Sequence, residues 1–147
     1  MPEVTQKARQ EWMSVVAKAP PQRLADLLPD PPAHVFLRHP EVGAVMVQGR
    51  IGGTGAAFNL GEMTVTRASV RLENGPVGHA WVQGRDKAHA MRAAVIDALM
   101  QTEKAPALQR DVISVLAAEA AAQKAARAAK AAATKVDFFT MVRGEDK

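Results

Sequence analysis

The chain has 147 residues, a formal net charge of +4 and no cysteine. This length predicts a single domain over residues 1–147, and the lack of cysteine excludes disulfides, cysteine-ligated zinc and any iron–sulfur cluster held by this chain. The basic residues are scattered along the sequence, away from stacking aromatic side chains, which argues against a nucleic-acid-binding module.

The N-terminal stretch MPEVTQKARQEW is polar and mixed in charge, unlike a signal peptide. Elsewhere no run approaches the ~18 uninterrupted apolar residues of a membrane span. We therefore expect a cytoplasmic protein without a membrane partner.

Two short helices are predicted at the N-terminal end. Apolar residues recur at helical spacing over residues 5–19, and Thr5 is placed to act as an N-cap. Pro20 and Pro21 end this helix. A second helix over residues 22–28 stops before a group of further prolines.

A glycine cluster follows a predicted strand at residues 41–51. The cluster, Gly52-Gly53-Thr54-Gly55, stands beside Arg50 and looks at first like a phosphate-binding loop. However, no Gly-Lys-Ser/Thr follows it and the next segment reads as a strand, so a Walker loop and a dinucleotide fingerprint are both excluded. We predict a plain hairpin connection, with a close-approach site for an anion or a partner backbone as the alternative.

The next predicted strand, residues 62–72, has an interrupted pattern. Apolar side chains lie on one face up to Val65 and on the other face from Ala68 onward. The pattern predicts either a bulge near Thr66 and Arg67 or a strand that is covered on both faces.

The remaining elements complete an α+β fold. An Asn-Gly turn at positions 74 and 75 leads into a strand over residues 77–83, which gives a small antiparallel sheet. Helical spacing then predicts helices over residues 86–101 and 107–135, the second of them alanine-rich. The expected architecture is N-terminal helices, a small antiparallel β-sheet, and C-terminal helices with a docked apolar tail.

The chain ends in that apolar tail. Phe138, Phe139, Met141 and Val142 follow the alanine-rich helix, and Arg143 comes next. Left in solvent, such a segment would favour aggregation. We expect it to form an interface, either with the chain's own sheet or with another chain, and both alternatives stay open.

Few polar residues suggest chemistry. Arg85 and Lys87 flank a predicted helix start and could bind a phosphate there, unless Asp86 caps the helix and the two cations are solvated. His79, Asp86 and His89 are weak catalytic candidates, because no nucleophile–base or paired-carboxylate pattern accompanies them. No histidine pair has the spacing of a helical metal site, so we expect no metal.

Several stretches are specific in combination, because they occur together in one order and at one spacing. They are residues 9–15, 52–55, 61–67, 70–72, 78–87, 96–101 and 136–144. Through them the chain resembles the PhnG family, a subunit of the bacterial carbon–phosphorus lyase core complex. The least similar parts are residues 20–41 and the alanine-rich helix.

The resemblance implies a role in the bacterial use of phosphonates. In this family the G, H, I and L subunits convert ATP and methylphosphonate into α-D-ribose 1-methylphosphonate 5-triphosphate and release adenine. The chain would then be a non-autonomous subunit of a transferase. The implied partners are the H, I, J and L subunits in a hetero-oligomer, ATP is a substrate of the complex, and this chain alone binds no cofactor.

The resemblance brings no catalytic residues with it. We therefore expect a scaffolding role that supports the I subunit. In this hypothesis Arg50, Arg67, Arg85 and Lys87 complete a surface that can contact phosphate. The alternative is that one of the weak catalytic candidates contributes directly to a shared active site.

Overall fold

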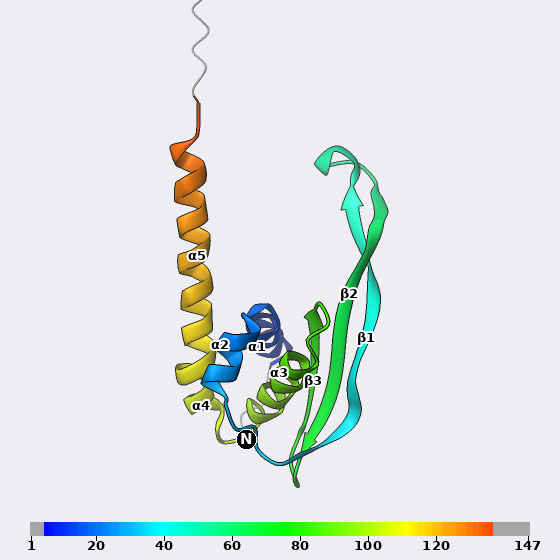
Figure 1. The fold of residues 1–147 in the computed structure, drawn as a ribbon, viewed down its shortest axis with the longest axis vertical. Coiled ribbons are helices and arrows are strands. Elements are labelled where there is room, and N and C mark those ends of the chain that lie inside the picture. The colour runs from blue at the N-terminus through cyan, green and yellow to red at the C-terminus, as the bar shows by residue number, and fades with distance from the viewer. Residues whose placement is uncertain (1–4, 137–147) are drawn as a thin grey trace, which may run out of the picture.

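The computed structural model describes residues 5–136 and confirms the predicted α+β architecture. One antiparallel sheet is flanked by helices from both ends of the chain (Figure 1). In chain order the elements are α1 (Gln6–Lys18), α2 (Pro21–Leu27), β1 (His34–Arg50), the 3₁₀ turn η1 (Ile51–Gly53), β2 (Ala57–Leu72), β3 (Val77–Gln83), α3 (Lys87–Leu99), α4 (Ala105–Leu108), the π-helical turn η2 (Gln109–Ile113) and α5 (Ser114–Ala133).

Local sequence signals set several of these boundaries. The side chain of Thr5 accepts a hydrogen bond from the backbone N of Ala8, which confirms it as the N-cap of α1. Asp86 caps α3 in the same way, by accepting from the backbone N of His89. Asn74 adopts a positive φ of 50° in the turn between β2 and β3, as Asn tolerates better than most residues.

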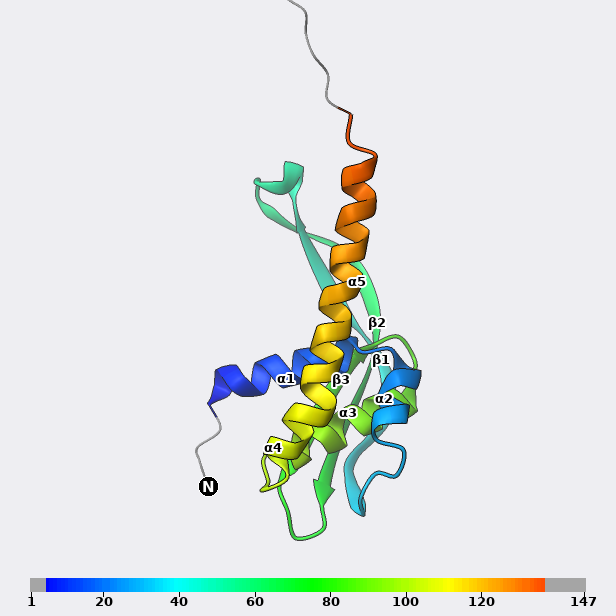
Figure 2. The same cartoon turned by 90° about the vertical axis from the view of Figure 1, so that its left-hand side faces the viewer.

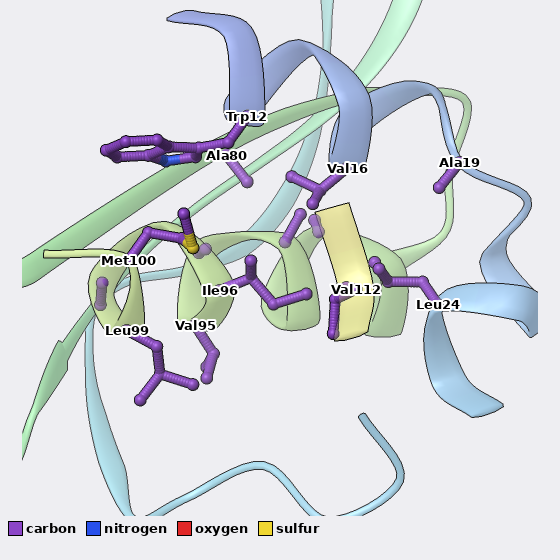
Figure 3. Close-up of a cluster of buried hydrophobic side chains, with 14 of the residues drawn as sticks. Trp12, Val16, Ala19, Leu24, Ala80, Val95, Ile96, Leu99, Met100 and Val112 are labelled. Carbon is purple, nitrogen blue, oxygen red and sulfur yellow. The ribbon is translucent and has the colours of Figure 1, made fainter. Parts of the chain in front are cut away.

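The three strands lie in the order β1-β2-β3, and the helices pack against one face of the sheet. α3 covers β2 and β3, and α1 and α2 pack on α3 from the other side. Val16 of α1, Leu24 of α2 and Ile96 of α3 point into one buried cluster (Figure 3). The core is therefore built around α3.

A glycine allows α3 to approach the sheet closely. A Cβ on Gly78 of β3 would collide with the carbonyl oxygen of Ala94 and with the side chain of Ala98. The side chains of Ala94 and Ala98, the two α3 residues at this contact, are small and completely buried. The close contact therefore depends on small residues in both partners.

Both long strands extend further than the sequence pattern predicts. β1 starts at His34 rather than near residue 41, and β2 starts at Ala57 rather than near residue 62. Each added segment pairs with a predicted part of the other strand, for example His34 with Leu72 and Ala57 with Arg50. Backbone pairing does not need an apolar pattern, so no periodicity marks these segments in the sequence.

The irregularity expected near Thr66 and Arg67 lies in the neighbouring strand. β1 carries register shifts between Phe36 and Glu41, whereas β2 pairs regularly with β3 from Val65 to Arg71. Thr66 continues the core-facing alternation, because it is fully buried and its hydroxyl donates to the carbonyl of Gly84 at 2.7 Å. In the sequence the polar Thr66 interrupts the apolar pattern of this face. In the structure its hydroxyl can be buried because it is hydrogen-bonded.

Two segments project from the body in the same direction. The first is the outer half of the β1–β2 hairpin, residues 41–62, which we call the arm, and the second is α5 (Figures 1 and 2). No residue of the arm is buried. In α5 the last side chain buried in the body is Leu116, and all residues from 120 to 133 are exposed.

The described part of the chain contains no helix that is long and apolar enough to cross a membrane. The predicted apolar tail with Phe138, Phe139, Met141, Val142 and Arg143 lies outside the described residues.

Candidate functional site

A buried carboxylate links three elements of the body. Asp97 of α3 is fully buried and accepts hydrogen bonds from Arg9 Nε and Nη2 at 3.1 and 2.7 Å. It also accepts from Trp12 Nε1 and from the backbone N of His79, both at 2.9 Å. Four donors thus satisfy one carboxylate, as a buried charge requires.

This network has a positioning role, since Asp97 has no free face for a ligand. It ties α1 to α3 and fixes the backbone of β3 at His79. Asp97 also acts on Arg9, because hydrogen bonding to its carboxylate raises the pKa of that guanidinium. Asp97 is not among the candidate residues predicted from the sequence. The signal that marks it there is a carboxylate inside the apolar stripe of a helix.

The side chain of His79, a residue of β3, lies on the face of the sheet opposite α3. There His79 Nδ1 lies 2.8 Å from Ser69 Oγ. In the next pair of residues, the guanidinium of Arg67 stacks over the ring of Trp81, with 5.5 Å between its Cζ and the ring centroid. Both pairs are cross-strand neighbours of β2 and β3.

A carboxylate holds two arginines on the same face. Glu41 Oε1 accepts from Arg67 Nε at 2.6 Å, and it also pairs with Arg38. Arg38 and then Arg67 hold the pKa of Glu41 below its ordinary value. All three side chains are about half exposed, so these ion pairs order the surface more than they stabilise the fold.

The predicted phosphate contacts are not brought together. Gly52 and Gly53 take positive φ angles at the tip of the arm, and Arg50 Nη1 donates to the carbonyl of Gly55 at 3.2 Å. This confirms the glycine cluster, including Thr54, as a hairpin connection. Nine residues of β1 separate Glu41, the partner of Arg67, from Arg50, which corresponds to about 30 Å along the strand.

Arg85 and Lys87 are found at a third place, the turn from β3 into α3. Both side chains are exposed, and Asp86 between them is the helix cap. The basic surface proposed from the sequence is therefore spread over the arm tip, the sheet and this turn.

The three catalytic candidates are divided between two sides of the sheet. His79 lies on the face opposite α3, whereas His89 is buried, with Nε2 at 2.9 Å from the carbonyl oxygen of Val16. Asp86 and His89 line a cavity of about 340 Å³ together with Arg92, which the sequence analysis did not single out. Within residues 5–136 the Nε of Arg92 is buried without a hydrogen-bond partner.

A larger cavity of about 860 Å³ opens at the base of the body. It lies between the β2–β3 turn and the end of α3, and Asn74, Gln101 and Lys104 are among its lining residues. None of the sequence-predicted site residues lines it. Over the described residues, no group of three or more His, Asp and Glu side chains could hold a metal ion.

Comparison with known proteins identifies the family. Residues 7–144 match the family described as "Phosphonate metabolism protein PhnG". The chain belongs to the PhnG family. A relative from Rhizobium meliloti (strain 1021), described as "Alpha-D-ribose 1-methylphosphonate 5-triphosphate synthase subunit PhnG", is 48% identical over 141 residues, which cover 94% of this chain and 90% of the relative.

The stretches that carry the resemblance to the PhnG family have clear structural roles. Residues 78–87 contain the close-contact glycine Gly78, the cap Asp86, and two residues, His79 and Trp81, on the open face of the sheet, which is the face opposite α3. Residues 96–101 contain the buried Asp97. In this structure these stretches build the sheet, its open face and the contact with α3.

Proposed function

We propose that the chain is a non-autonomous subunit of an α-D-ribose 1-methylphosphonate 5-triphosphate synthase, the transferase that acts in cytoplasmic phosphonate catabolism. The name of the Rhizobium relative and the extent of the match support this assignment. The chain's own role is scaffolding in a hetero-oligomer with the H, I, J and L subunits. ATP is a substrate of the complex, and this chain binds no cofactor by itself.

The two projections carry the scaffolding proposal. The arm exposes large apolar side chains, namely Val42, Met46, Ile51, Phe58 and Leu60. An element that buries none of its own residues gains little stability from the body, yet it presents apolar surface that a partner would remove from water. α5 has the same character over residues 120–133.

Co-expression with the H, I, J and L subunits tests the proposal. We expect the full chain to co-elute with them in size exclusion and the assembly to release adenine from ATP when methylphosphonate is present. A variant that lacks residues 138–147 should fail to co-purify with the I subunit, because the predicted interface residues Phe138 to Arg143 are removed. A full chain that elutes alone would reject the assignment to this assembly.

Direct participation in the shared active site is the second candidate. The observation that favours it is the cavity where Asp86 and His89 meet the unpartnered Arg92. Arg92→Ala and His89→Ala separate the two roles in the reconstituted complex. Loss of adenine release with normal assembly would favour a catalytic role for this chain. Unchanged adenine release would leave scaffolding as its remaining role.

A further inference from the structure

The face of the sheet opposite α3 carries a compact set of polar and aromatic residues, which we call the open face. Strand register arranges these residues in three rows across β1, β2 and β3, because paired residues project to the same side. The rows are Glu41–Arg67–Trp81, Arg38–Ser69–His79 and Val35–Arg71–Val77. No described helix lies over these rows (Figure 1).

Large side chains on this face remain in water. Trp81 is 51% exposed and Val35 is 55% exposed. Tryptophan and arginine are the residue types that most often dominate the energy of protein interfaces. Exposed tryptophan beside several arginines is therefore typical of a protein-binding surface.

The side chains of the open face are ordered before any partner binds. Glu41 holds Arg67, Arg67 stacks on Trp81, and Asp97 fixes the β3 backbone at His79 from the other side of the sheet. A surface that is already ordered loses less side-chain entropy on association. The open face thus meets a requirement for tight binding that flexible surface arginines do not meet.

Charge identifies the chemistry of the partner. Of the three arginines of the open face, Arg38 and Arg67 pair with the carboxylate of Glu41. Within residues 5–136 the side chain of Arg71 makes no hydrogen bond or ion pair. A surface that covers these arginines must supply carboxylates, because a buried guanidinium without an acceptor is strongly unfavourable. A second copy of this face would bring like charges together.

The shape favours a protein over a small anion. Small-molecule sites are concave, and the cavities of about 860, 380, 340 and 330 Å³ are lined by other residues. The open face is a three-stranded surface with its aromatic ring standing in water.

We infer that the open face docks on an acidic surface of another subunit of the synthase, with Trp81 as its aromatic anchor and Arg71 as an ion-pairing residue. This inference rests on the proposed function. It assigns the open face as an interface in addition to α5 and to the arm, whose first residue, Glu41, it includes.

Charge reversal and truncation in the full chain test the inference, with the co-expressed subunits as the probe. Trp81→Ala and Arg71→Glu are expected to weaken assembly on the order of ten- to hundredfold. Arg110→Glu is the matched control, because Arg110 is an exposed arginine on η2 that pairs with its neighbour Asp111. Thermal unfolding of the isolated variants should match that of the unchanged chain, since both substituted side chains are exposed.

Hydroxyl-radical footprinting supplies a readout without substitution. Trp81 should lose most of its reactivity in the assembled complex and regain it in the free chain. The inference would be overturned if Trp81 were equally reactive in the free chain and in the complex. It would also be overturned if Trp81→Ala and Arg71→Glu assembled as strongly as the unchanged chain. If the unchanged chain does not assemble, the proposed function itself fails and this inference falls with it.

Two further probes test other occupants of the open face. Tripolyphosphate and a single-stranded oligonucleotide are titrated into the free chain at physiological salt, with Trp81→Ala as the reference for the contribution of Trp12. We expect no saturable change in Trp81 fluorescence. A saturable change that is lost in Trp81→Ala would assign the open face to an anion or nucleic acid and would overturn the protein partner.

Discussion

At the scale of single residues, polar groups of this protein serve either to hold the fold or to shape its open surface. Asp97 belongs to the first kind, since all of its contacts are internal. Glu41 belongs to the second, since it organises arginines that stay in contact with water. The two carboxylates should therefore respond differently to substitution and to pH.

Asp97→Ala should lower the free energy of unfolding by roughly 3–5 kcal/mol, because it leaves Arg9, Trp12 Nε1 and the His79 backbone N without their acceptor. Chemical denaturation of the isolated chain measures the effect. Asp111→Ala removes a carboxylate from an exposed ion pair and serves as the control, with little change expected. Equal stability of the two variants would contradict the buried network.

Lowering the pH should disorganise the open face before the body unfolds. Because the pKa of Glu41 is lowered in the folded chain, its pairing is fully present above the ordinary value of 4.5 and is lost as the pH falls through the lower folded value. The indole resonance of Trp81 should follow this titration through Arg67. In Glu41→Gln the same acid transition should be missing; a Trp81 signal that still titrates there would count against the prediction.

At the scale of elements, the distance between packed elements explains the choice of residues better than secondary-structure preference does. α3 lies so close to β3 that the position of Gly78 has no room for a side chain. The arm shows the opposite case, because there the strands pair with each other and nothing in the described part of the chain buries them.

Gly78→Ala should destabilise the chain by about 1–3 kcal/mol or more, because the added methyl group must push α3 away from the sheet. Gly61→Ala is the matched control: it lies in β2, and a Cβ there would have no heavy atom within 4 Å. Thermal unfolding of both variants checks the prediction. A Gly78→Ala protein that is as stable as Gly61→Ala would show that the contact is looser than described.

At the scale of the whole molecule, the chain divides into a body that holds itself together and two projections that do not contribute to its core. The body contains the buried cluster around α3. The arm and α5 leave it in the same direction, as both views show (Figures 1 and 2). Stability and assembly should therefore be separable by editing the projections.

Replacing residues 46–62 with an Asn-Gly turn that joins the paired residues Val45 and Met63 should leave the body folded, because none of the removed residues is buried. The melting temperature should change little, while co-elution with the H, I, J and L subunits is lost. A shortened chain that assembles normally would remove the arm from the proposed scaffold. One that no longer folds would show that the body needs the arm.

The sequence by itself determined the helix starts at Thr5 and Asp86, the Asn-Gly turn, the α+β class and the family, because these depend on local residue chemistry or on motifs in fixed order. It did not place Arg50, Arg67 and Arg85 relative to one another, and the length of β1 between Glu41 and Arg50 separates Arg50 from Arg67. It also left open whether β2 has a bulge near Thr66 and Arg67 or is covered on both faces.

Only the tertiary structure decided which face each residue occupies and what fills the space around it. His79 and His89 are both weak catalytic candidates in the sequence. In the structure His79 reaches an open surface, whereas His89 is buried and donates from Nε2 to the backbone carbonyl of Val16. The link that Asp97 makes between α1, α3 and β3 is visible only in the folded chain. There Arg9 and Trp12, which lie 88 and 85 positions from Asp97 in the sequence, donate hydrogen bonds to its carboxylate. Such contacts arise from packing between distant segments, and no local pattern encodes them.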